Sequence, residues 1–508
     1  MTPGRPSPAS KDVRRPMRPR IRTLLQAALL GVLAPLGHAL AQGVPAGSGP
    51  GIGFDTADDF STLRGTDPGQ PVEISPVQGI EAIDVGTLRT TTTDTAEEQQ
   101  GRVTRQAAEQ PVTGNEEDGA TKRKKTPDAR DETAYDPTGI AVGSFTLFPA
   151  LELRGGYTSN AAQVSTGGPS GLVTLAPDIL LQSNWDRHDF QFRLKGAYEY
   201  FTDTTVSPDP YLYVEANGRI DLPRDWALRL KADYTYDTQS TNQLGYPGNV
   251  DNPPGVSTYD GGATLDGSVG NTTLQLRGTA TYTGYDPVEV GDITVTQAYL
   301  DNTLVNGAVR VGYKVSPTLA PFVEAELSSR IFNRPTDPLG YSRNSNGITL
   351  RGGLAYSADP ILKGEIALGW RHQQYVDSQF DSFDLPTIDA SLIWSPTPLT
   401  QVALLAATYV DPAYDINASS TIVYDLGLQV QRYIRRNFTL EADLGYQYQH
   451  YLDFDVNQVT YEAALQGTWK LNREAWLVGR LQQEYFQSAS DGGSYPTTTA
   501  TIGLRLQR

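Results

Sequence analysis

Apolar and polar residues alternate along most of the chain after residue 145. The segment 437–454, NFTLEADLGYQYQHYLDF, sets Phe438 and Leu440 against Glu441 and Asp443. The same alternation recurs in FQFRLKGAYEYF, WALRLKADYTY, TIVYDLGLQVQ and VTYEAALQGTWKL. A period of two places successive side chains on opposite faces of a strand, so each of these stretches predicts a strand with one apolar face and one charged face.

The connections between these stretches alternate in length. Short turns are predicted at NWDRHD, LPRDW, VGNTT, VSPTL, SADPI, SPTPL, IRRNF and LNREA, and longer polar connections lie between them. This alternation is typical of outer-membrane barrels, in which short turns face the periplasm and long loops face the exterior. We therefore predict an all-β fold, a transmembrane antiparallel β-barrel of about 18 strands with both ends in the periplasm, in which the segment 437–454 is strand 15.

Soluble antiparallel folds are the alternatives to a membrane barrel. A propeller, a lectin-like sandwich or a β-helix predicts strands of about 5 to 6 residues, or aromatic and glycine motifs at a fixed period. The alternating stretches are 10 to 16 residues long and show no such period. Spanning strands need about 9 to 11 residues, which the sequence supplies.

Aromatic residues gather at the two ends of the predicted strands. Five tryptophans lie beside the predicted short turns: Trp185, Trp226, Trp394, Trp469 and Trp476. Tyrosines lie toward the other ends: Tyr198, Tyr200, Tyr234, Tyr236, Tyr282, Tyr446 and Tyr448. Amphipathic rings prefer bilayer interfaces, so both groups are predicted to form girdles, with carbohydrate stacking by a few tyrosines as the alternative.

The chain before the barrel divides into two regions. Residues 1–41 join a basic stretch to the apolar run TLLQAALLGVLAPL and a small-residue site, which predicts a cleaved signal peptide. A retained anchor is the alternative, although 14 residues are short for a membrane span. Residues 42–137 predict a disordered, low-complexity periplasmic segment before the barrel at 138–508. Its KRKK cluster at 122–125 is either an electrostatic tether or a solvated patch of the linker.

Charge and composition exclude several functions. The formal net charge is −17, and removing a leader that holds seven Lys and Arg and one Asp makes the rest −23, so no nucleic-acid partner is expected. With no Cys and four His, neither a cofactor nor a metal site is predicted. His372 and His450 lie near predicted outer ends and His188 in a short turn, without a nucleophile or carboxylate pattern around them, so the chain is not expected to be an enzyme.

The charged faces of the strands are predicted to line the lumen, because a charge facing lipid is costly. The predicted pore-lining residues are Arg193, Lys195, Glu199, Arg229, Lys231, Asp233, Arg277, Arg310, Glu324, Glu326, Arg351, Lys363, Glu365, Arg371, Asp425, Glu441, Asp443, Glu462, Lys470, Arg480, Glu484 and Arg505. Such a mixed-charge face suits a hydrated passage. Alternatively, these groups pair with each other and only stabilise the barrel. The long connection at 238–257 is the candidate to fold into the passage, with an ordinary exposed loop as the alternative.

The start of the barrel resembles a known family. The segment 145–161, FTLFPALELRGGYTSNA, is similar to the opening strand of the putative beta-barrel porin 2 family, with the matching residues Phe145, Leu147, Pro149, Tyr157, Ser159 and Asn160. The resemblance implies an outer-membrane protein linked to exopolysaccharide export, partnered by periplasmic or inner-membrane polysaccharide machinery. The chain departs from typical barrel-assembly signals by ending in Arg508 instead of an aromatic residue.

Together these observations predict a channel in the outer membrane of a Gram-negative bacterium. It is expected to pass hydrophilic solute, and the resemblance narrows this to exopolysaccharide. Its expected partners are outer-membrane lipid, the barrel-assembly machinery and periplasmic polysaccharide-export components. The alternative is a structural or surface-recognition barrel whose lumen does not conduct.

Overall fold

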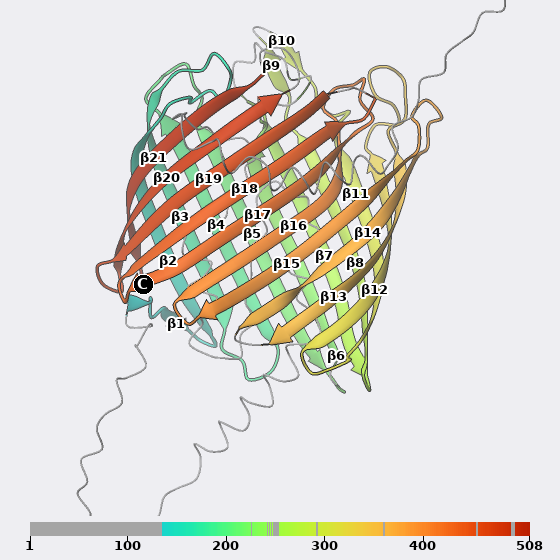
Figure 1. The fold of residues 1–508 in the computed structure, drawn as a ribbon. Coiled ribbons are helices and arrows are strands. Elements are labelled where there is room, and N and C mark those ends of the chain that lie inside the picture. Colours follow the sequence, from blue (N-terminus) through green and yellow to red (C-terminus); the bar gives the residue numbers. More distant parts are fainter. Residues whose placement is uncertain are drawn as a thin grey trace, which may run out of the picture. The chain divides into compact units, whose positions relative to one another are not determined.

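A closed β-barrel makes up the part of the chain that the computed structural model describes, residues 135–508 without 225, 241, 243, 245, 247–252, 291–292, 359–360, 454–455 and 489–492. In this part, 18 long antiparallel strands pair with their neighbours in chain order, and the first, β2 (Phe145–Thr158), pairs with the last, β21 (Tyr495–Gln507), to close the ring. Figure 1 shows the strands tilted around the barrel. The prediction of an 18-stranded barrel is confirmed.

The remaining barrel strands follow one another around the ring. They are β3 (Ser170–Ser183), β4 (Asp189–Phe201), β5 (Asp209–Leu222), β6 (Trp226–Thr238), β7 (Gly255–Val269), β8 (Thr272–Tyr285), β11 (Asn302–Tyr313), β12 (Leu319–Phe332), β13 (Ser345–Ala358), β14 (Leu362–Tyr375), β15 (Phe383–Thr397), β16 (Thr400–Pro412), β17 (Ser420–Arg435), β18 (Phe438–Tyr451), β19 (Val456–Lys470) and β20 (Ala475–Ser488). A short strand, β1 (Ile140–Val142), pairs with β2. The hairpin of β9 (Val288–Val290) and β10 (Ile293–Val295) lies in the connection between β8 and β11.

The predicted strand 15 is β18, the fifteenth strand around the barrel. The short turns occur where the sequence predicts them, for example between β17 and β18 and between β19 and β20. The predicted signal peptide, the cluster at 122–125 and nearly all of the predicted linker lie outside the described residues. Within the described part, no helix is long and apolar enough to cross a membrane.

The two faces of the strands differ in chemistry and in exposure. On β18, the outward Leu444 is 50% exposed, whereas the inward Asp443 is 1% exposed. Leu153, Leu368 and Leu504 are likewise exposed leucines in strands. A belt of exposed aliphatic side chains around a closed barrel would be unstable in water, and it suits contact with lipid acyl chains.

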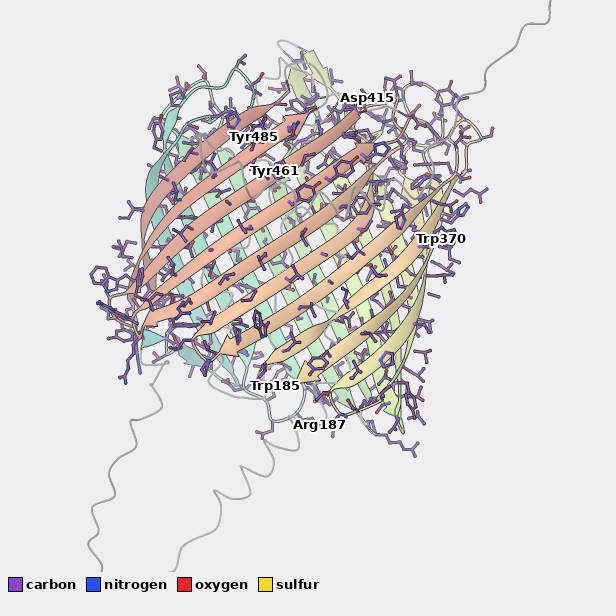
Figure 2. The ribbon with its side chains drawn as sticks, viewed as in Figure 1. Trp185, Arg187, Trp370, Asp415, Tyr461 and Tyr485 are labelled. Atoms are coloured by element: carbon purple, nitrogen blue, oxygen red, sulfur yellow. The ribbon has the colours of Figure 1, made fainter. Side chains whose placement is uncertain are left out.

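Aromatic side chains mark the two ends of this belt. Tyr446 of β18 packs against Tyr461 of β19 with ring centroids 5.4 Å apart, and Tyr461 packs against Tyr485 of β20 at 6.5 Å. Figure 2 shows Tyr461 and Tyr485 toward the long-loop end and Trp185 at the opposite end. Such rows of rings are typical of interfacial girdles.

Trp476 corrects the predicted tryptophan girdle. Its side chain is 1% exposed and lies under the ammonium of Lys470, which is 4.5 Å from the ring centroid. The register explains this, because Trp476 is directly opposite Lys470 whereas Trp469 is directly opposite Leu477. Opposed residues share a face, so the two tryptophans beside this turn must point to opposite sides of the barrel wall.

Candidate functional site: the inward face of the barrel

The structure places the predicted pore-lining residues on the inward face of their strands. Within each strand they share the parity of side chains that are buried or half-buried, such as Arg193, Glu365 and Glu441. The aliphatic residues between them are half-buried or exposed, for example Leu230 at 43% between Arg229 and Lys231. The cross-strand register agrees, since Arg310 is opposite Glu324 and Glu462 is opposite Glu484. Contact of these residues with a passing solute stays a prediction.

One part of the wall is a dense ion-pair network. It spans β8 and the consecutive strands β11 to β15 and consists of Arg277, Arg310, Arg351, Glu324, Glu326, Glu365 and Asp389. Arg351 Nη1 lies 2.9 Å from both Glu324 and Glu326, and its Nε lies 2.8 Å from Asp389. Arg310 donates to Glu324 at 2.7 Å and to Glu365 at 2.9 Å. For this network the structure supports the stabilising interpretation, since its charges neutralise each other along the wall.

A second group of charges lies around the seam between the first and last strands. Asp178 of β3 lies 3.3 Å from Arg193 of β4 and 3.0 Å from Arg505 of β21, so one carboxylate links both sides of the seam.

Two more ion pairs lie on the inward face of β6. Lys231 pairs with Asp233 of the same strand at 2.8 Å, and Arg229 pairs with Asp266 of β7.

Asp178 and Asp266 are absent from the predicted lining. Asp178 sits in the apolar run LAPDILL, where alternation is lost because β3 carries buried leucines on its inward face as well. Asp178 has the same parity as Thr174, which faces inward, and the opposite parity to Leu175, which is exposed; counting residues along the strand from these two places Asp178 on the inward face.

The connection between β6 and β7 folds inward at the long-loop end. Asn242 donates from Nδ2 to Tyr495 Oη at 3.0 Å, and its carbonyl accepts from Gln458 Nε2 at 3.0 Å. Leu244 N donates to Tyr451 Oη at 3.4 Å. These partners lie on β21, β19 and β18, far around the barrel from β6 and β7, so the described residues of this connection reach across the barrel. Of the two alternatives for this connection, the contacts of Asn242 and Leu244 support the infolded loop.

Buried arginines brace the same end of the barrel. Arg330 of β12 donates to Val410 O of β16 at 2.9 Å and to Asn302 Oδ1 at 2.8 Å. In the next connection, Arg343 pairs with Asp337 at 3.1 Å and donates to Ala413 O at 3.0 Å. Hydrogen bonds from a guanidinium to main-chain carbonyls are charge-assisted, so Arg330 and Arg343 fasten the described parts of this end to β16 and to the connection that follows it.

The histidines make local contacts. His372 Nδ1 lies 2.8 Å from Asp384 Oδ1, and its ring stacks on Trp370 with centroids 5.9 Å apart. Both His372 and Asp384 are exposed, and Figure 2 shows Trp370 on the outer surface of the barrel. His450 Nδ1 lies 2.7 Å from Asn457, and His188 accepts from Asp221 N at 3.0 Å. Among the described residues, no group of three or more His, Cys, Asp or Glu could hold a metal ion.

Fold and wall together define the class: an outer-membrane β-barrel with a polar, charged inward face. Residues 133–508 match the model of the family described as "Putative beta-barrel porin 2". The chain belongs to this family, which is the family that the opening strand resembles. It is therefore a porin-like barrel of the Gram-negative outer membrane.

The chain has low similarity to several solved outer-membrane proteins. The siderophore receptor PirA from Pseudomonas aeruginosa is 11% identical with a TM-score of 0.36, over 73% of this chain and 81% of that chain. The outer membrane protein OpdK from Pseudomonas aeruginosa is 8% identical with a TM-score of 0.36, over 71% and 99%. The copper transporter OprC is 8% identical with a TM-score of 0.39, over 73% and 81%. Among curated proteins, no sequence matches significantly.

Proposed function

We propose that the barrel is a non-enzymatic channel that passes hydrophilic solute across the outer membrane, and that this solute is an exopolysaccharide leaving the cell. The carrying observation is the inward face, where charged and amide side chains follow one another on strand after strand. Eighteen strands enclose an interior wider than side chains alone can fill. Water is the natural occupant of a polar interior of that width, and hydrated solutes can follow it.

A polysaccharide suits this wall chemically. Its hydroxyl groups both donate and accept hydrogen bonds, and the wall offers carboxylates, guanidinium groups, Gln amides and Thr hydroxyls along its length. A chain of hydroxyl groups can exchange one such partner for the next as it moves. The partners proposed with this function are outer-membrane lipid, the barrel-assembly machinery and periplasmic polysaccharide-export components.

The second candidate function is a surface-recognition barrel whose lumen does not conduct. It is favoured by the contacts at the long-loop end, where Asn242 and Leu244 bind partners on the far strands and Arg343 binds Ala413 O. In a channel, the same contacts form a constriction that limits the size of the passing solute.

Solute flux tests the channel. Proteoliposomes that hold the purified protein are placed in iso-osmotic sugars of increasing size, and swelling is followed by light scattering. The Leu244 side chain packs against Ala413, Ala418 and Tyr451, so Leu244→Ala should loosen the infolded loop. We expect swelling with small sugars and a size limit that relaxes in this variant. Absence of swelling with every sugar, in the wild type and in the variant, would favour the recognition barrel.

Gene deletion tests the exopolysaccharide. We expect loss of secreted polysaccharide while cell-associated polymer continues to be made, and restoration by the wild-type gene. Unchanged secretion in the deletion strain would count against export and would leave a general diffusion channel.

A further inference from the structure

The inward faces of β17, β18, β19 and β20 carry more carboxylates than cations. The carboxylates are Asp425, Glu441, Asp443, Glu462 and Glu484, and the cations are Arg480 and Lys470. Lys470 lies at the turn end of β19, where its ammonium binds Asp136 at 2.8 Å. Arg480 is therefore the cation that faces the carboxylates along the middle of these four described strands.

The register brings these groups into adjacent rows. One row across the four strands is Gln431, Glu441, Gln466 and Arg480, and the next is Gln429, Asp443, Ala464 and Gln482. The third row is Gly427, Gly445, Glu462 and Glu484. Ala464, Gly427 and Gly445 occupy positions in these rows but have no long side chain to place over the neighbouring carboxylates. We call the three rows the acidic wall.

Arg480 satisfies this wall only loosely. Its Nη1 lies 3.4 Å from Asp443 and its Nη2 lies 3.9 Å from Glu462. In the network on β11 to β15, by contrast, Arg351 holds three carboxylates at 2.8 to 2.9 Å. One guanidinium at long range leaves the acidic wall with a net negative charge, whereas the other wall is close to neutral.

Two buried side chains in the acidic wall lack hydrogen-bond partners in the structure. Gln466 is 1% exposed, and neither its Nε2 nor its Oε1 makes a hydrogen bond. Glu462 is 6% exposed, and neither of its carboxylate oxygens accepts a hydrogen bond. Buried polar groups are nearly always satisfied by a hydrogen-bond partner, and one left without a partner is destabilising. The open amide thus requires one donor and one acceptor, and the open carboxylate requires donors.

We propose that the acidic wall is a binding subsite for solutes that present hydroxyl and ammonium groups, such as an amino-sugar unit. Carboxylates accept hydrogen bonds only, so hydroxyl and ammonium donors satisfy Glu462, while a hydroxyl can both donate to and accept from the amide of Gln466. The net charge repels anionic solutes and attracts cationic ones. The subsite deepens the proposed function and rests on it, since it lies inside the lumen that the channel would open.

Binding is measured without transport by saturation-transfer NMR on the purified full chain in detergent. The probes are glucosamine, which carries an ammonium group, the neutral N-acetylglucosamine and the anionic glucuronate. We expect glucosamine to bind more tightly than N-acetylglucosamine, and glucuronate to bind least.

The variants assign this preference to the acidic wall. Glu462→Gln should weaken glucosamine binding about tenfold or more, since the ammonium then meets a neutral amide oxygen in place of a charged carboxylate. Glu462→Asp, which keeps the charge, should retain most of the affinity. Glu474→Gln, in the exposed turn after β19, is the matched control and should bind like the wild type. Equal binding of the three sugars, or glucosamine binding that Glu462→Gln leaves unchanged, would overturn the proposal.

The outcome is separable from that of the channel. Sugar preference lost in Glu462→Gln, together with a protein that passes no solute, would refute the channel and keep the subsite. Swelling of proteoliposomes without any preference for glucosamine would keep the channel and refute the subsite. Heat-dependent migration on electrophoresis confirms that each variant is folded.

Discussion

Removing Arg351 should destabilise the barrel more than removing any exposed arginine. Its guanidinium contacts Glu324 and Glu326 at 2.9 Å and Asp389 at 2.8 Å, and all four side chains are buried. Two unit charges about 4 Å apart attract by about 4 kcal/mol at an effective dielectric constant of about 20, and desolvation offsets part of this. Removing one partner of a buried ion pair costs about 3–5 kcal/mol, because a buried charge loses its counter-charge.

We therefore expect Arg351→Met to lower the free energy of unfolding by about 3–5 kcal/mol. The measurement is reversible urea unfolding in lipid vesicles, followed by tryptophan fluorescence. Arg351→Lys should fall between, because one ammonium cannot reproduce the fork of contacts. The control is Arg436→Met, since Arg436 is exposed in the short turn between β17 and β18; it should change stability by less than about 0.5 kcal/mol. If Arg351→Met changes stability as little as Arg436→Met, the network does not stabilise the wall.

Three further predictions concern the lipid face, the wall and the long-loop end. Leu444→Arg puts a charge on an outward position that is 50% exposed and should cost about 2–4 kcal/mol in vesicle unfolding, whereas Leu444→Ile should be neutral; equal stabilities would refute the lipid contact. In single-tryptophan variants, brominated lipid should quench Trp469 strongly and Trp476 weakly, and strong quenching of Trp476 would contradict its inward position. Tyr451→Phe removes the hydroxyl that accepts from Leu244 N at 3.4 Å, which should weaken loop anchoring by about 1 kcal/mol and raise the frequency of wide-open current levels in single-channel recordings; unchanged recordings would show that the hydroxyl does not hold the loop.

The sequence predicts the fold well because a period of two is a direct consequence of strand geometry. Glu441 and Asp443 alternate with Leu440 and Leu444, so placing the carboxylates on the inward face of β18 also places the leucines on its outward face. The number of strands follows from the alternation of short turns and long loops. Trp476 is the exception, since it faces inward although it lies beside a short turn like the outward Trp469. The number of residues in the turn decides which residues of the two strands are opposed, and so on which face each tryptophan lies.

The contacts of the inward face are less predictable. Alternation shows that Arg351 and Arg480 face inward, but it does not show that Arg351 meets three carboxylates closely while Arg480 meets two at longer range. That difference depends on which charges share a row across three or four strands. The inward path of the loop at Asn242 depends on partners more than 200 residues away along the chain, which no local pattern encodes.

Single-channel recording of the purified protein in planar bilayers tests the channel most directly. We predict stepwise current increases as individual barrels insert, with cations passing more readily than anions because the acidic wall is net negative. Glu462→Gln combined with Asp443→Asn should shift the reversal potential toward that of an unselective pore. A folded, inserted protein that gives no current steps in either the wild type or Leu244→Ala would contradict the account.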